Sequence, residues 1–127
     1  MINKEIKMSE KINFNEKYLK FSEYWEPKVI SKMNNYQFKL VKIKGDFVWH
    51  SHEETDEAFI VIEGKMEIHL RTDIIKLNSG ELYVVKKGVE HKPFAEEDCH
   101  IMIIEPENIS NTGNKNNKMT SKNNIWI

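Results

Sequence analysis

The chain has 127 residues, enough for one domain with its own hydrophobic core but not for two. Its 19 basic and 20 acidic residues nearly balance, so its charge gives no reason to expect nucleic acid or an anionic membrane as a partner. The sequence has no apolar stretch of the roughly 20 residues that a membrane span needs, and its single cysteine cannot form an internal disulfide. We therefore expect a soluble, cytoplasmic protein.

The first element predicted along the chain is a short helix over residues 15–25, which carries tyrosine, leucine, phenylalanine and tryptophan on one side. Asn13 or Asn15 could cap its start. Pro27 should end it, because the residue before a proline is pushed out of the helical region. Residues 1–27 are thus predicted to be an N-terminal arm whose short helix packs on the rest of the protein.

Residues 28–106 have the pattern of β-structure throughout, with turns rich in glycine, asparagine and aspartate between short apolar runs. The expected strands are 28–33, 36–44, 46–52, 57–63, 65–70, 73–77, 81–85 and 99–105. Short strands at this even spacing favour a sandwich or barrel built from hairpins. The predicted fold class is all-β.

Residues 107–127 change to a polar composition that is typical of a loosely ordered tail. The last three residues, Ile125-Trp126-Ile127, are unusually apolar for such a tail, and they could dock on the body of the protein.

Two of the expected strands, 58–62 and 101–104, are apolar on both faces. One face can fill the interior, whereas the other needs a cover from the N-terminal helix, a second sheet or a second subunit. We expect a homodimer that buries the free face of 58–62 together with Trp49 and the helix.

Histidines and acidic residues gather around residue 50. His50 and His52 lie two apart in an expected strand, so both imidazoles should project from the same face, about 7 Å apart. Glu57 opens the next strand, and His91 comes from a later hairpin. Each residue alone is weak evidence, because single histidines and turn carboxylates are usually surface or pocket residues. Together, three imidazoles and one carboxylate predict a divalent-metal site.

The segment 45–64 resembles the first motif of the cupin superfamily: a glycine, His-x-His, a glutamate and a second glycine. In this chain these residues are Gly45, His50, His52, Glu57 and Gly64. The segment 80–91 is similar to the second motif, and its matching residues are Gly80, Gly88 and His91. The resemblance covers residues 36–105 and is strongest to small single-domain cupins of the conserved-barrel type (cupin 2). It implies a single cupin jelly-roll barrel, also called a double-stranded β-helix.

Two positions depart from the second motif. Lys86 stands where the family usually has proline, and Ala95 where it often has asparagine. Neither position is a metal ligand in the family, so the departures concern the geometry of the turn before His91 and contacts to a substrate.

The resemblance implies that His50, His52, Glu57 and His91 are the metal ligands. Imidazoles with one carboxylate suit iron, manganese, nickel, copper or zinc as divalent ions, whereas calcium and magnesium prefer shells of oxygen alone. Four protein ligands on a metal that favours six leave two positions for water or substrate. The alternative is a site without metal that serves only as a binding cavity.

Strand alternation predicts which side chains line the cavity around the metal. The expected lining residues are Phe38, Val48, Phe59, Val61, Tyr83 and Met102. Leu82 is the alternative to Tyr83, and the pair Ile101/Ile103 is the alternative to Met102/Ile104. For all of these residues, ordinary packing in the core is the alternative to a role in lining the cavity. Such a cavity suits a small oxygen-bearing organic ligand. The single arginine, Arg71, disfavours phosphorylated or diacid ligands.

Two functions fit these features. A metal-dependent enzyme of the isomerase, dioxygenase or lyase type is favoured by the family resemblance, and a non-catalytic module that binds a small ligand is the alternative. The sequence identifies no certain catalytic base, although Tyr83, Lys39 and His100 are candidates. His69 is expected to be exposed, and His100 to be a core or interface residue rather than a fifth ligand.

Overall fold

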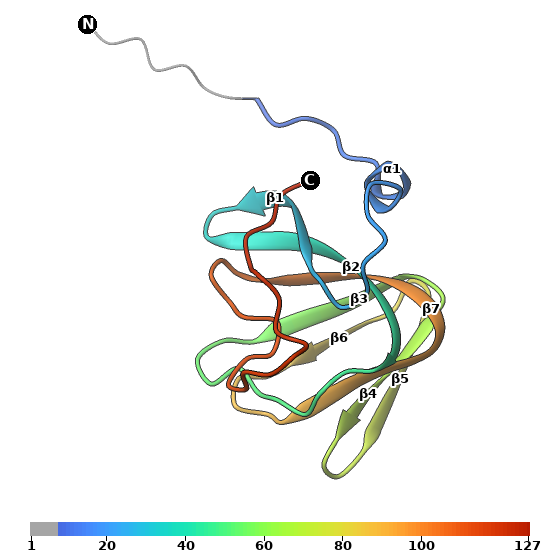
Figure 1. The fold of residues 1–127 in the computed structure, drawn as a ribbon, viewed down its shortest axis with the longest axis vertical. Coiled ribbons are helices and arrows are strands. Elements are labelled where there is room, and N and C mark those ends of the chain that lie inside the picture. The colour runs from blue at the N-terminus through green and yellow to red at the C-terminus, as the bar shows by residue number, and fades with distance from the viewer. Residues whose placement is uncertain (1–7) are drawn as a thin grey trace, which may run out of the picture.

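The computed structural model describes residues 8–127, and Figure 1 shows their fold. The part of the expected N-terminal arm at residues 1–7 lies outside the described residues. One short helix, α1 (Phe14–Tyr18), precedes the strands. The strands are β1 (Lys28–Met33), β2 (Tyr36–Asp46), β3 (Glu57–Glu63), β4 (Lys65–Leu70), β5 (Ile74–Asn78), β6 (Leu82–Val85) and β7 (His91–Pro106).

The long strand β7 organises the barrel. Its first residues, His91–Phe94, pair with β4, and from Phe94 onward it pairs with β2 on one side. Its second half also pairs with β3, so the strand order is β1-β2-β7-β3-β6, with the β4–β5 hairpin attached to the start of β7. All these strand pairs are antiparallel. The sheet curls into an all-β jelly-roll barrel, which confirms the predicted fold class (Figure 1).

Two apolar clusters lie on opposite faces of this curved sheet. The interior cluster fills the barrel; its buried members include Val41, Ile43, Phe59, Val61, Ile68, Val85, Ile101 and Ile103. The outer cluster lies beneath the N-terminal segment; its buried members are Tyr18, Phe21, Ile30, Leu40 and Met102. Consecutive residues of β7 thus serve different clusters, as expected for a strand whose side chains alternate.

The helix is shorter than the predicted 15–25, because contacts with β2 take over after Leu19. Asn13 is the cap, and its side-chain oxygen accepts a hydrogen bond from the Glu16 amide at 3.0 Å. Beyond the helix, the Phe21 carbonyl accepts a 2.6 Å hydrogen bond from Lys42 Nζ, and the Trp25 amide donates to the Lys42 carbonyl. These bonds hold residues 20–27 in a non-helical path along the barrel.

The outer cluster also covers the β3 face that was expected to need a partner. Ile60 and Ile62 are half-buried against this cluster. The cluster includes Tyr18 and Phe21, which are only 2% and 8% exposed. The N-terminal segment therefore covers the outer face of β3, as one of the alternatives from the sequence proposed. The homodimer stays a prediction.

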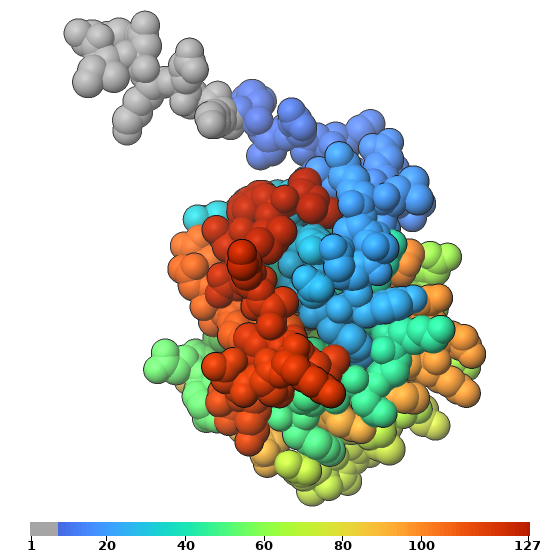
Figure 2. All heavy atoms as spheres, in the orientation of Figure 1, coloured from blue at the N-terminus to red at the C-terminus, as the bar shows by residue number. Residues whose placement is uncertain are grey.

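The C-terminal tail packs on the barrel and is not the loose segment that its composition predicts. The Val29 amide donates to the Ile125 carbonyl at 2.7 Å, and the Ile127 amide donates to the Val29 carbonyl at 3.1 Å. Residues 125–127 thus extend the sheet beside β1 in a short parallel bridge. Figure 2 shows the tail and residues 14–27 side by side over one face of the molecule.

No helix among residues 8–127 is long and apolar enough to cross a membrane.

The outer cluster should contribute measurably to stability. We expect Tyr18→Ala to lower the free energy of unfolding by about 3 kcal/mol, because it empties a buried site and removes the hydrogen bond from the Tyr18 hydroxyl to the Ile101 carbonyl. The neighbouring Leu19 is 87% exposed, so Leu19→Ala should change stability by less than about 0.5 kcal/mol. Urea denaturation measures both, and similar values for the two variants would show that the segment does not pack as described.

Candidate metal centre

The centre is built where the loop after β2 meets the segment before β7. The backbone groups of His50 and His91 exchange two hydrogen bonds, of 3.0 and 2.9 Å. The Phe47 amide donates to the Pro93 carbonyl, and the Gly88 amide donates to the His52 carbonyl. Along the loop these contacts fall at residues 47, 50 and 52, and along the facing segment at residues 93, 91 and 88. The spacing is three residues against two and then two against three, which prevents a regular strand ladder. The predicted strand 46–52 is therefore an irregular stretch, and β7 begins at His91 rather than at residue 99.

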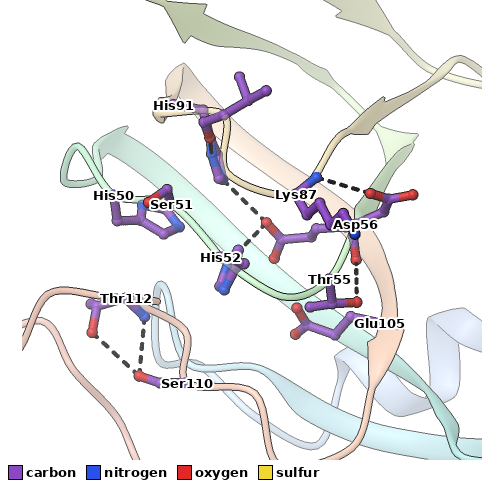
Figure 3. Close-up of polar contacts among 12 residues, drawn as sticks. His50, Ser51, His52, Thr55, Asp56, Lys87, His91, Glu105, Ser110 and Thr112 are labelled. Carbon is purple, nitrogen blue, oxygen red and sulfur yellow. Dashed lines mark hydrogen bonds and ion pairs between the residues drawn. The ribbon is translucent and has the colours of Figure 1, made fainter.

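The structure brings the four predicted ligand residues together. His50 and His52 come from this loop, Glu57 opens β3 and His91 opens β7. One nitrogen or oxygen of each lies within 4.8 Å of those of the other three. All four side chains are buried, His91 completely and Glu57 to 4% exposure. Figure 3 shows the three imidazoles around a common space.

Backbone carbonyls fix the orientation of two of the rings. Nδ1 of His50 lies 2.9 Å from the Val48 carbonyl, and Nδ1 of His91 lies 2.9 Å from the Val89 carbonyl. Because a carbonyl can only accept, each Nδ1 carries the proton, which leaves the lone pair on Nε2. His91 Nε2 lies 3.2 Å from Glu57 Oε1, and the Nε2 atoms of both rings are left available to a metal.

The electrostatics favour neutral His50 beside ionised Glu57. Burial lowers the pKa of His50 to about 4, and the neighbouring His91 adds to this shift. Burial alone would raise the pKa of Glu57, but His52 and His91 in their protonated forms outweigh burial and hold that pKa below its ordinary range. Burial lowers the pKa of His52, but Glu57 outweighs this effect and holds it above the ordinary value. One carboxylate thus faces three close imidazoles.

A divalent cation fits this group of residues. Nε2 of His52 is buried and makes no hydrogen bond, although it lies 3.2 Å from Glu57 Oε1. An unpaired buried nitrogen is costly unless another partner binds it. Three imidazole nitrogens and a carboxylate oxygen are also the donors that first-row transition metals accept.

A cavity of mainly apolar walls adjoins the four residues. It is lined by Trp25, Pro27, Val41, Ile43, Phe47, His50, Glu57, Phe59, Pro93, Ile101, Ile103, Glu105 and Asn111. The open space of this cavity is about 30 Å³, so a ligand of more than a few atoms needs the walls to move apart.

Known proteins resemble this region in both fold and sequence. A family model described as Cupin domain matches residues 39–105, more than half of the chain. This chain belongs to the cupin family.

Individual relatives agree with this assignment. The structure of a cupin-2 domain containing protein from Shewanella frigidimarina is 59% identical, with a TM-score of 0.75 over 76% of this chain and 94% of that chain. Protein NMB1881 from Neisseria meningitidis is 33% identical, with a TM-score of 0.71 over 77% of this chain and all of that one. The uncharacterized protein YdbB of Bacillus subtilis (strain 168) is 35% identical over 66 residues, and the match spans 57% of its length.

The cupin cavity includes only part of the predicted lining. Phe59 is one of its lining residues. Val61 and Tyr83 pack in or against the interior cluster without lining the cavity, and Val48 is half-buried beside His50.

Two lining predictions need correction, because they assumed the opposite strand phase. Phe38 and Met102 lie with the outer cluster, on the other face of the sheet. Ile101 and Ile103, the alternative pair, line the cavity instead. Strands that are apolar on both faces do not reveal which face turns inward.

Sequence reasoning missed a buried ion pair in the cavity wall. Lys39 Nζ lies 2.8 Å from Glu105 Oε2, and both side chains are 2% exposed. Burial and the nearby charge of Glu57 raise the pKa of Glu105, whereas Lys39 opposes this shift. Alternation could have found the pair, since Lys39 is in phase with Val41, and Glu105 with Ile103.

Asp56 holds the turn in which Lys86 replaces the usual proline. Its Oδ1 accepts a hydrogen bond from the Lys87 amide at 2.9 Å (Figure 3). Its Oδ2 lies 3.5 Å from Lys86 Nζ. A side-chain contact from the other motif thus stabilises the turn that precedes His91.

The remaining histidines stand apart from the centre. His69 is 24% exposed and lies 2.8 Å from Glu67, so it is less exposed than expected. His100 stacks on Tyr18 with ring centroids 4.2 Å apart and is 26% exposed, which places it in the packing of the outer face.

The tail contacts the first ligand loop directly. The Asn114 amide donates to the Ser51 carbonyl at 3.0 Å, and the Ser51 amide donates to Asn114 Oδ1 at 2.9 Å. Gly113 has a φ of +56°, and a Cβ placed on it would lie 2.2 Å from the Ser51 carbonyl oxygen and 3.1 Å from His50 Cδ2. Only glycine fits between the tail and the loop that carries His50.

Gly113→Ala should separate the tail from this loop. We expect faster hydrogen exchange at the Ser51 and Asn114 amides, because the added methyl group cannot share the space of the Ser51 carbonyl. Gly80→Ala is the matched control: its φ is also positive, +85°, but its Cβ would meet nothing within 4 Å. It carries a similar backbone strain and should leave exchange at both amides unchanged. Equal exchange in the two variants would contradict the close contact.

Proposed function

We propose that this cupin binds one divalent transition-metal ion through His50, His52, Glu57 and His91. Three features support the proposal: the four donors lie close together, backbone carbonyls orient two of the rings, and the buried Nε2 of His52 lacks a hydrogen-bond partner. Iron, manganese, nickel, copper and zinc all suit these donors.

The observation that carries a function beyond metal binding is the position of the cavity. Two of the four residues, His50 and Glu57, also line the cavity, so a ligand held there would lie next to the metal. Four protein donors leave coordination positions open on a six-coordinate ion. A metal bound there would supply a Lewis acid to an oxygen atom of the ligand.

On this basis we propose an enzyme that acts on a small oxygen-containing organic molecule, with a reaction of the isomerase, dioxygenase or lyase type. The chain's own part would be to orient the ligand between aromatic and aliphatic walls and to exclude water from the reacting atoms. The alternative is a non-catalytic module that retains a small ligand. The small open space of the cavity is compatible with it, because a tight site can hold a ligand without converting it.

Metal analysis tests the centre. Protein purified without chelators should contain about one transition-metal ion per chain, and His91→Ala should lose most of it, because one of four donors is removed. His69→Ala is the matched control, since His69 pairs with Glu67 and does not belong to the centre. Equal metal content in the two variants would show that His91 is not a ligand.

Turnover separates the two functional alternatives. Metal-loaded protein is incubated with a mixture of small hydroxylated and carbonyl metabolites, and mass spectrometry follows both the solution and the protein-bound fraction. An enzyme depletes one compound and forms a product, and His91→Ala abolishes the conversion. A compound that stays bound and unchanged would instead support the binding module. Conversion that persists with zinc, which has no redox chemistry, would exclude an oxidation.

A further inference from the structure

The Lys39–Glu105 pair is polar, buried and unused by the proposed metal centre. β2 contributes Lys39 and β7 contributes Glu105, two adjacent strands of the barrel. Burying two charges costs several kcal/mol, and the attraction between them offsets this cost only when their remaining polar atoms also find partners. The pair should therefore be satisfied on every side if its role were only structural.

The Glu105 carboxyl group is not satisfied. Its Oε2 contacts Lys39 Nζ at 2.8 Å, but its Oε1 is buried and has no hydrogen-bond partner. The residue is 1% exposed and belongs to the lining of the same cavity as His50 and Glu57. In Figure 3 its carboxyl group points toward the side of the site on which His52 lies. The structure thus leaves one polar atom free in a mainly apolar wall beside the metal centre.

We propose that Glu105 Oε1 is a second recognition point of the cavity, which hydrogen-bonds a hydroxyl group of the ligand while another oxygen of the ligand lies at the metal centre. The inference rests on the proposed function, because it assumes that the metal is bound. Lys39 acts as a positioning residue, since it holds Oε2 and thereby orients Oε1.

The surroundings of Oε1 define the class of ligand. An alcohol or phenol hydroxyl can donate to an ionised carboxylate and can accept from a protonated one, so it suits either state of Glu105. A second carboxylate on the ligand would instead meet a like charge. Trp25, Phe47 and Phe59 line the cavity and suit a flat, apolar skeleton. The expected ligand is a small, uncharged hydroxylated molecule with a further oxygen for the metal.

Phenol and catechol are suitable probes, because catechol adds one hydroxyl group to the same ring. Their affinities are measured by calorimetry on zinc-loaded protein, since zinc does not oxidise catechol. The test variant is Lys39→Met with Glu105→Leu, which removes both charges together and leaves neither buried alone. The control is Lys32→Met with Glu107→Leu. This exposed pair has a Nζ–Oε2 distance of 2.7 Å, and its side chains are 41% and 37% exposed.

We expect the test variant to bind catechol about tenfold more weakly than the wild type, which corresponds to the loss of one hydrogen bond to a charged group. Its affinity for phenol should change less than about twofold. The zinc content of both variants should equal that of the wild type, since neither pair belongs to the centre. In the proposed mode one catechol oxygen lies at the zinc and the other hydroxyl group donates to Glu105 Oε1. Catechol that chelated the zinc with both oxygens would leave no hydroxyl group for Glu105, and the test variant would then lose no affinity.

The outcomes separate this inference from the proposed function. Equal losses for phenol and catechol, or no loss for either, with normal zinc content would overturn the role of Glu105 and leave the metal centre intact. Failure of the wild type to bind catechol more tightly than phenol would likewise overturn it. Failure of the wild type to bind zinc would overturn the metal centre itself, and the two-point binding mode with it.

Discussion

The reciprocal backbone hydrogen bonds between His50 and His91 are the constraint on which the site depends. They join two segments that are far apart in sequence and fix both residues at one height in the barrel. Since a pair of residues that exchanges both bonds sits face to face, the two imidazoles lie together, with centroids 4.3 Å apart. Glu57, the first residue of the neighbouring strand β3, completes the group. A loss of this bridge would separate two of the four donors, whereas ordinary strand pairing elsewhere would survive.

The fold was largely predictable, because turn residues and alternation marked most strands within a residue or two. The helix was overestimated because local propensity does not include Lys42, which captures the Phe21 carbonyl. The tail was misjudged for a similar reason. Its composition is polar, yet Gly113 fits against Ser51 in a way that only the three-dimensional contact reveals. In both places long-range contacts outweighed the conformational preference of the local sequence.

The candidate site was predictable where residue type carried the information, and less so where strand phase did. Histidines and a glutamate in the two motifs identified the four donors that lie together. Phe59 shares its strand face with Glu57 and lines the cavity, whereas β7 is apolar on both faces and gave no sign that Met102 lies with the outer cluster. Glu105 escaped notice because a charge at the end of an apolar run resembles a solvated strand end. Its burial depends on Lys39, a partner 66 positions away.

The docking of residues 125–127 has a consequence for the colloidal behaviour of the protein. β1 is an edge strand of the main sheet, and its Val29 amide and carbonyl are both occupied by the tail. Edge strands with free backbone groups are templates for pairing between molecules. Detachment of Ile125-Trp126-Ile127 would free that template and expose Ile127, which packs against the outer cluster. Residues 125–127 therefore occupy the backbone edge at Val29, where a second molecule could otherwise pair.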